Sequence, residues 1–171
     1  HPRSVAIIGV PRSMKTGKLF FVSLLDQGFP GETYPVSAHA NEIDGFKAYP
    51  NVTAIPGTVD LAIILVSQNQ ALSTLKECAA KGVKGAILYT AGFKETGTEE
   101  GHIYEKQLVE VARSSGMRLI GPNCVGIYAP RSGLSFFPQL TKEPGPVGLV
   151  SHSGSLAQLI SYVGPKWGIR F

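Results

Sequence analysis

A loop that combines glycines with basic residues near the start of the chain is the segment best suited to hold a phosphate. It spans residues 9–17 (Gly-Val-Pro-Arg-Ser-Met-Lys-Thr-Gly), and four basic residues precede the first acidic residue, Asp26. Where such a loop joins a strand to a helix, the free N–H groups of the helix and the local positive charge both favour an anion. An ordinary strand-to-helix turn is the alternative interpretation.

The same loop lacks the two common nucleotide fingerprints. Val10 and Pro11 follow Gly9, whereas the dinucleotide motif G-x-G-x-x-G requires a glycine two places on. The Gly-Lys pair at 17–18 precedes leucine instead of the Ser or Thr of a Walker loop. Residues 37–41 (Ser-Ala-His-Ala-Asn) contain no acid for the ribose of NAD. These departures favour a nucleotide whose ribose carries phosphate, or one held differently, over NAD.

A second cluster of polar residues lies near the end of the chain, in residues 151–155 (Ser-His-Ser-Gly-Ser). At a helix N-terminus these residues predict a phosphate cradle made by Ser151, Ser153, Gly154 and Ser155. The alternative is a nucleophile elbow in which Ser153 attacks an acyl group. That motif requires glycine at position 151 and Asp and His partners further along, which the sequence does not supply.

The two cysteines, Cys78 and Cys124, form no disulfide framework and no zinc-binding spacing. We therefore expect a reducing, cytoplasmic setting and no metal site. Cys78 falls on the apolar stripe of a predicted helix and is expected in the core. Cys124 is open to two interpretations, a nucleophile or a buried structural cysteine.

Composition narrows the class of protein. The 171 residues are 43% hydrophobic and 16% charged, with 20 Gly and 12 Pro, which indicates a globular chain and excludes disorder, collagen and coiled coil. No apolar run reaches the roughly 18 residues of a membrane span, and no signal-peptide core precedes Ser4. The net charge is +4, but without a Lys/Arg run, an RNP-like stretch or zinc-finger spacing we expect no nucleic-acid partner.

Apolar periodicity predicts strands that alternate with helices. Strands are expected at residues 4–9, 33–37, 60–66, 84–90 and 117–120, and helices at 18–27, 68–81 and from about 103 to 116. This order implies right-handed crossovers and a doubly wound parallel sheet, the Rossmann-like α/β class. Ligands of such sheets bind beyond the carboxyl ends of the strands.

The last quarter of the chain predicts a change of unit. Residues 1–130 make the first domain, and residues 131–146 read as a linker, part of a stretch from 123 to 146 that is rich in Gly, Pro and Ser and could hold one short strand. A strand at 147–150 and a helix at 154–166 predict the start of a second, flavodoxin-like α/β domain within residues 147–171. The first residue is His1, and the chain stops within an apolar stretch, so we expect a piece of a longer protein.

Three motifs after successive strands carry a family resemblance. They are Ala-Gly-Phe-Lys-Glu at 91–95, Gly-Pro-Asn-Cys-x-Gly at 121–126 and Ser-x-Ser-Gly-x-Leu at 151–156. In this order they resemble the CoA-binding, or alpha, part of the NDP-forming acyl-CoA synthetases, the family of succinyl-CoA synthetase alpha and ADP-forming acetyl-CoA synthetase. The resemblance covers essentially the whole chain.

The resemblance implies that CoA lies across the switch point of the sheet. Its phosphates would lie near the first loop, its pantetheine arm along residues 90–92, and its thiol near Asn123 and Cys124. The family's lysine after the second strand is missing here. His39 could donate to the ribose phosphate when protonated, or it could be an exposed loop histidine. The implied CoA-binding residues are Gly9, Val10, Pro11, Arg12, Ser13, Lys15, Thr16, Gly17, Ser37, His39, Ser67, Gln68, Thr90, Ala91, Gly92, Asn123 and Cys124.

The resemblance also implies a reaction for the longer protein. An acid, CoA and a nucleoside triphosphate would give acyl-CoA, nucleoside diphosphate and phosphate, through an acyl phosphate and a phosphohistidine. That histidine would lie beyond residue 171, so His152 is not expected to serve as it, and no catalytic residue is expected within these 171 residues. An ATP-grasp unit, fused or separate, would bind the nucleotide. The alternative is a CoA-sensing domain of a protein acetyltransferase without ligase activity.

Overall fold

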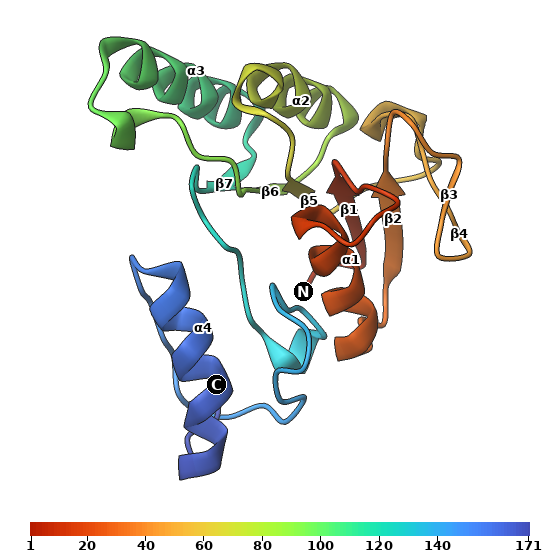
Figure 1. The fold of residues 1–171 in the computed structure, drawn as a ribbon. Helices are drawn as coiled ribbons and strands as arrows, with labels where there is room; N and C mark the ends of the chain where they lie inside the picture. The colour runs from red at the N-terminus through yellow and green to blue at the C-terminus, as the bar shows by residue number, and fades with distance from the viewer.

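The computed structural model describes all of residues 1–171, and its centre is a parallel sheet of five strands in the order β2-β1-β5-β6-β7 (Figure 1). The strands are β1 (Ser4–Ile8), β2 (Glu32–Val36), β5 (Leu61–Ile64), β6 (Gly85–Leu88) and β7 (Arg118–Ile120). The helices are α1 (Thr16–Gln27), α2 (Gln68–Lys81), α3 (Glu99–Ser115) and α4 (Gly154–Val163). The predicted doubly wound, Rossmann-like α/β class is confirmed, with strand bounds within a few residues of those expected.

The two faces of the sheet bury separate cores because successive side chains of a strand point in opposite directions. In β1, Val5 and Ile7 pack on the side of α1, whereas Ala6 and Ile8 pack on the side of α2 and α3. All five residues of β1 are buried, as expected for a central strand of a parallel sheet. Figure 1 shows α2 and α3 together on one face and α1 on the other.

Cys78 of α2 is fully buried in the core shared with α3, as the sequence predicts. Burial, together with the nearby carboxylate of Glu77, raises the pKa of the Cys78 thiol to about 12. The thiol therefore stays protonated at neutral pH and packs as a small apolar group.

Along the chain, β2 and β5 are separated by a short hairpin of β3 (Glu42–Ile43) and β4 (Phe46–Lys47), which was not predicted. Its turn is Asp44-Gly45, and both residues have positive φ, 50° and 80°. Asp-Gly is a recognised hairpin signal, but two-residue strands are too short to give a periodicity. The turn is held to α1 by an ion pair of 2.6 Å between Lys18 Nζ and Asp44 Oδ1.

The segment 131–146, predicted as a linker, packs against the sheet. Leu134, Phe136 and Leu140 are buried in the core on the α1 side, and Gln27 Nε2 of α1 donates to Leu140 O at 2.8 Å. The segment is irregular, apart from the end of a 3-10 helix, Pro130–Ser132, and one isolated bridge between Ala129 and Leu134. Helix α1 covers only part of this face of the sheet. Residues 131–146 cover the rest with apolar side chains, as a second helix would in many sheets of this class. The division into domains stays a prediction.

The strand predicted at residues 147–150 is absent, whereas helix α4 is present as predicted and is followed by a 3-10 helix, Gly164–Trp167. No neighbouring strand lies beside residues 147–150, and the backbone N–H of Val147 donates to Arg170 O at 3.1 Å. Residues 147–150 are exposed, Val150 at 97%, and so is Trp167 of the 3-10 helix, at 79%. No helix is long and apolar enough to cross a membrane.

The packing of the 131–146 segment predicts the effect of truncating Leu140. Leu140→Ala should lower the free energy of unfolding by about 3 kcal/mol, because it removes buried methyl groups and leaves a cavity. Leu159→Ala, at a side chain that is 57% exposed, should cost about 0.5 kcal/mol or less. Urea unfolding of both variants measures the two costs. Equal costs would mean that the segment is a loosely attached linker.

Candidate functional site

A cleft of about 570 Å³ lies at the carboxyl ends of β1 and β5. The chain leaves β1 for β2 on one side and returns to β5 on the other, so the loops that follow β1 and β5 part at this point. Such a switch point is the usual ligand site of a doubly wound sheet. The cleft is lined by residues 8–12, 36–40, 50–51 and 65–67 and by Gln70, Thr74 and Glu77.

The loop after β1 forms one wall of the cleft. Gly9 has a φ of 98°, and its N–H donates to Val36 O at 3.0 Å, which ties the loop to β2. A Cβ on Gly17 would lie 2.5 Å from Gly9 O, so glycine at both positions lets α1 begin directly against the strand end. The loop thus brings the start of α1 to the edge of the sheet.

The start of α1 is open and positive. No side chain caps this end, and no acidic residue lies in its first turn. Arg12 and Lys15 are exposed, and neither forms an ion pair. Lys18 is different, since it is buried and neutralised by Asp44, so the positive charge available to a ligand comes from Arg12 and Lys15 together with the helix N-terminus.

The opposite walls are polar and were only partly predicted. Ser37 and His39 follow β2 and line the cleft as expected, and Ser67 lines it after β5. Pro50, Asn51, Gln70, Thr74 and Glu77 also line the cleft and were missed. The last three recur at helical spacing on α2, so projecting the face of that helix toward the strand ends would have found them. Asn51 has no comparable signal.

The predicted residues after β6 hold loops together. Thr90 Oγ1 donates to Val66 O at 2.5 Å, which joins the end of β6 to the end of β5. Gln68 Nε2 donates to Gly92 O. Gln68 and residues 90–92 do not line the cleft. Their hydrogen bonds hold the loop after β6 to the loop after β5, which does line it.

The Glu95 carboxylate fixes the shape of this loop. It accepts hydrogen bonds from Gly92 N at 2.6 Å and from Phe93 N at 3.2 Å. Burial by itself would raise the pKa of Glu95, but the backbone hydrogen bonds from Gly92, from Glu95 itself and from Phe93 outweigh it, so the pKa lies below its usual value. The charged form is therefore the one that stabilises the loop.

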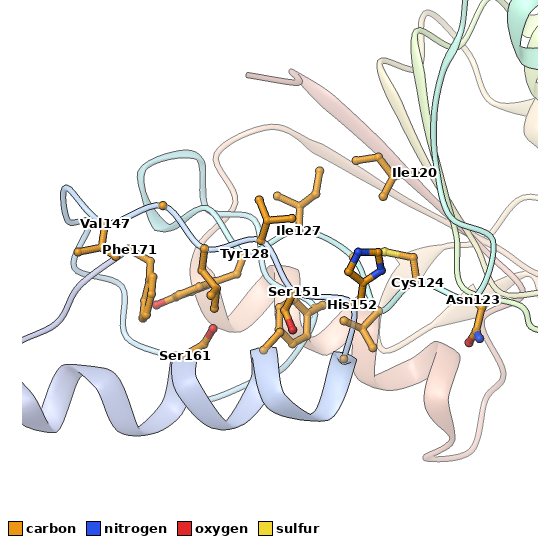
Figure 2. Close-up of a pocket in the computed structure, with 18 residues that line it drawn as sticks. Ile120, Asn123, Cys124, Ile127, Tyr128, Val147, Ser151, His152, Ser161 and Phe171 are labelled. Carbon is orange, nitrogen blue, oxygen red and sulfur yellow. The ribbon is translucent and has the colours of Figure 1, made fainter.

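Residues after β7 continue the same edge. Asn123 N donates to Thr90 O at 2.9 Å, and Cys124 N donates to Leu88 O at 3.3 Å, so the loops after β6 and β7 are bonded to each other. Asn123 and Cys124 do not line the first cleft. They lie at one end of a second cavity of about 480 Å³ (Figure 2). It is lined by Ile120, residues 123–128, Phe136, residues 147–152, Gly154, Ala157, Ser161 and Phe171.

The four predicted phosphate-cradle residues do not converge on one point. Ser151 and Gly154 line the second cavity, whereas Ser155 lines a shallow depression beside Leu159 and Tyr162. Ser153 Oγ accepts from Leu156 N at 3.3 Å and so serves as the N-cap of α4. The one hydrogen bond of the Ser153 hydroxyl is to the backbone N–H of Leu156, so no general base contacts it, as the nucleophile interpretation would require.

The structure thus divides the predicted residues among three places. Gly9, Val10, Pro11, Arg12, Ser37, His39 and Ser67 line the first cleft, and Asn123, Cys124, Ser151 and Gly154 line the second cavity. The others, Ser13, Lys15, Thr16, Gly17, Gln68, Thr90, Ala91, Gly92, Ser153 and Ser155, lie beside these hollows or hold their loops. No group of three His, Cys, Asp or Glu side chains is placed to hold a metal ion.

The depressed pKa of Glu95 predicts a pH-dependent contribution to stability. A carboxyl with a lowered folded-state pKa stabilises above its unfolded pKa, and this contribution is lost as the pH falls through the folded value. Glu95→Gln should lower the free energy of unfolding at pH 7 by about 1 kcal/mol or less, because the carboxylate is exposed, and should lower the melting temperature accordingly. The gap between the two proteins should narrow between pH 5 and pH 3.

Melts of both proteins over this pH range make the test. Glu110→Gln, at an exposed carboxylate of α3 with no ion pair, is the matched control and should show no such trend. A gap that does not change with pH would contradict the role given to the charged Glu95.

Comparison with known proteins places this arrangement in a family. Residues 3–130 match the model described as CoA binding domain. The chain is 46% identical over its full length to the alpha subunit of an ADP-forming acetate–CoA ligase II from Pyrococcus furiosus, of which it spans 37%.

Two solved structures are close in fold. PH0766 from Pyrococcus horikoshii OT3 aligns over 99% of the chain and 39% of its own, at 42% identity and a TM-score of 0.92. An acetyl-coenzyme A synthetase 1 from Ca. Korarchaeum cryptofilum, in complex with phosphate and ADP, aligns over 95% of the chain and 35% of its own, at 36% identity and a TM-score of 0.86. The chain spans well under half the length of each relative. Since the family match includes all five strands and the loops around the first cleft, the chain belongs to the CoA-binding domain family found in ADP-forming acyl-CoA synthetases.

Proposed function

We propose that the chain is the CoA-binding domain of an NDP-forming acyl-CoA synthetase, which converts an acid, CoA and a nucleoside triphosphate into acyl-CoA, nucleoside diphosphate and phosphate. The observation that carries the proposal is the open, positive start of α1 at the switch-point cleft, in a domain of the CoA-binding family. The relatives favour this activity over a CoA-sensing domain of a protein acetyltransferase.

The order of the loops along the sheet supports one direction for CoA. The phosphates would bind at residues 9–17, beside β1, and the ribose phosphate near Ser37 and His39. The pantetheine arm would pass residues 90–92 after β6, and the thiol would lie at Asn123 and Cys124 after β7. Neighbouring strands lie about 4.8 Å apart, so β1 and β7 are about 14 Å apart across this edge, a span suited to an extended arm.

Within this proposal the chain binds and orients CoA and supplies no catalytic residue. Arg12, Lys15 and the N–H groups of α1 would neutralise the phosphates. The thiol of CoA would attack an acyl phosphate, form the thioester and release phosphate. The phosphohistidine and the ATP-grasp unit would come from the rest of a longer protein or from a second subunit, which we place in the cytoplasm. Residues 147–171 would begin its succinyl-CoA-synthetase-like domain.

Ligand-dependent melting tests the proposal. CoA at about 100 times its dissociation constant should stabilise the chain by about 2.7 kcal/mol, which is a rise of about 5 to 10 °C for a domain of this size. NAD should give no rise, because the loop after β1 lacks the dinucleotide motif. Dephospho-CoA in parallel reports whether Ser37 and His39 read the ribose phosphate. A larger rise with NAD than with CoA would contradict the assignment.

Removing one positive charge tests where the phosphates bind. Arg12→Gln should weaken CoA binding about tenfold, which is the worth of one charge-assisted hydrogen bond, and the loss should shrink at high salt. Lys76→Gln removes an exposed charge from α2 that does not line the cleft, and its affinity should match the unmodified chain. Calorimetric titration of CoA measures all three. Equal affinities for Arg12→Gln and Lys76→Gln would place the phosphates elsewhere.

A further inference from the structure

An aromatic side chain, Tyr89, stands at the carboxyl edge of the sheet and lines neither the first cleft nor the second cavity. It follows directly after β6, and its N–H donates to Ile64 O at 3.1 Å, so it continues the alternation of the strand. Ile87, two residues earlier, is buried in the core on the α1 side. The Tyr89 ring therefore lies on the α1 side as well, and the residue is 36% exposed.

Tyr89 packs against helix α1 close to the open start of that helix. Its ring meets the ring of Phe20 edge to face, with centroids 5.4 Å apart and planes at 72°. Phe20 lies four residues after Thr16, the first residue of α1, and so lies on the same face of the helix. Tyr89 thus contacts α1 one helical turn from the end at which the phosphates of CoA are proposed to bind.

The loop after β7 lies next to the same pair of rings. Val125 and Ile127 pack against the core on the α1 side, and a Cβ on Gly126 would lie 3.7 Å from Cε1 of Phe20. Figure 1 shows the chain after β7 turning to the face of the sheet that carries α1. The start of α1 and residues 123–126, the two ends of the proposed path of CoA, therefore both lie beside the rings of Phe20 and Tyr89.

The opposite side of β6 is closed at the end of the strand. Gln68 Nε2, at the start of α2, donates to Gly92 O. Thr90 Oγ1 donates to Val66 O at 2.5 Å. These bonds join the loops after β5 and β6, so an extended ligand on the α2 side would have to displace them. On the α1 side the ring of Tyr89 is exposed to solvent instead.

We propose that the pantetheine arm of CoA crosses the edge of the sheet on the α1 side, with its geminal methyl groups packed on the ring of Tyr89. This inference rests on the proposed function and gives Tyr89 the role of positioning the arm between the phosphates and the thiol. The arm suits this contact because it carries two methyl groups on one carbon near the pyrophosphate. Packing them on an aromatic ring removes apolar surface of both partners from water.

The amides of the arm fit the same path. Each buried amide needs a donor and an acceptor, whereas an amide at the rim of the sheet is paired by loop backbone or by water. Residues 90–92 lie at this rim directly after Tyr89 and are partly exposed or exposed. The path over Tyr89 therefore buries the methyl groups of the arm and leaves its polar groups at the solvent side.

Titration of Tyr89→Ala with two ligands tests the contact. CoA contains the arm, whereas adenosine 3′,5′-bisphosphate contains the ribose phosphate end without it. Tyr89→Ala should weaken the binding of CoA about fivefold, because the methyl groups lose their apolar partner. Its affinity for adenosine 3′,5′-bisphosphate should stay within about twofold of that of the unmodified chain. Tyr89→Phe keeps the ring and should keep the CoA affinity within about twofold.

Tyr162→Ala is the matched control, since it removes an exposed ring of α4 that lines neither the first cleft nor the second cavity. Both of its affinities should match those of the unmodified chain. An equal loss for the two ligands in Tyr89→Ala would mean that the ring only supports the loop, and an unchanged CoA affinity would place the arm elsewhere. Either result overturns the inference and leaves CoA binding intact. Failure of the unmodified chain to bind either ligand would instead overturn the proposed function.

A measurement on the unmodified chain covers the case in which Tyr89→Ala does not fold. With CoA bound, nuclear Overhauser contacts should connect the geminal methyl protons of the arm to the ring protons of Tyr89. Contacts from these methyl groups to the side chain of Gln68 alone would place the arm on the α2 side and overturn the inference.

Discussion

The parallel pairing of β1 with β2 on one side and β5 on the other is the constraint on which the rest of the structure depends. Ile8 lies opposite Val36 and Ile64 in these ladders, so the three strands end together. Their next residues therefore begin three loops at one edge of the sheet. Backbone bonds then fix where two of the loops start, from Gly9 N to Val36 O and from Leu65 N to Ile8 O. The first cleft follows from this register and from the divergence of the chain after β1.

Charge at the cleft is set by the same packing. Lys18 follows the glycine that brings α1 against the strand end, and its side chain is buried. A buried ammonium without a partner would be costly. The ion pair with Asp44 removes this cost and holds the turn of the β3–β4 hairpin against α1. Because Lys18 is neutralised, Arg12 and Lys15 are the exposed, unpaired positive charges of the loop. The hairpin thus supports the site, although none of its residues 42–47 lines the first cleft.

The sequence was sufficient for β1, β5 and β6 because each is a buried apolar run. It was sufficient for α2 because the helix begins and ends at the predicted residues, 68 and 81. It was insufficient wherever tertiary contacts decide. Residues 147–150 have the composition of a strand, but no strand lies beside them. Residues 131–146 show no periodicity, yet Leu134 and Leu140 complete the core, which only the bare face beside α1 explains. Likewise the loop residues of the first cleft could be read from strand ends, whereas Asn51 reaches it through the chain's long path from β2 to β5.

The two cavities are coupled by a row of hydrogen bonds at the carboxyl edge of the sheet. Val66 accepts from the Thr90 hydroxyl, and the carbonyl of Thr90 accepts from Asn123 N, so the loops after β5, β6 and β7 are joined in series. Ser67, next to Val66, lines the first cleft, and Asn123 lines the second cavity. A ligand that spans both ends therefore meets a rigid spacing, because strands of one sheet do not slide. The sheet, more than any single side chain, sets the distance between the first cleft and the second cavity.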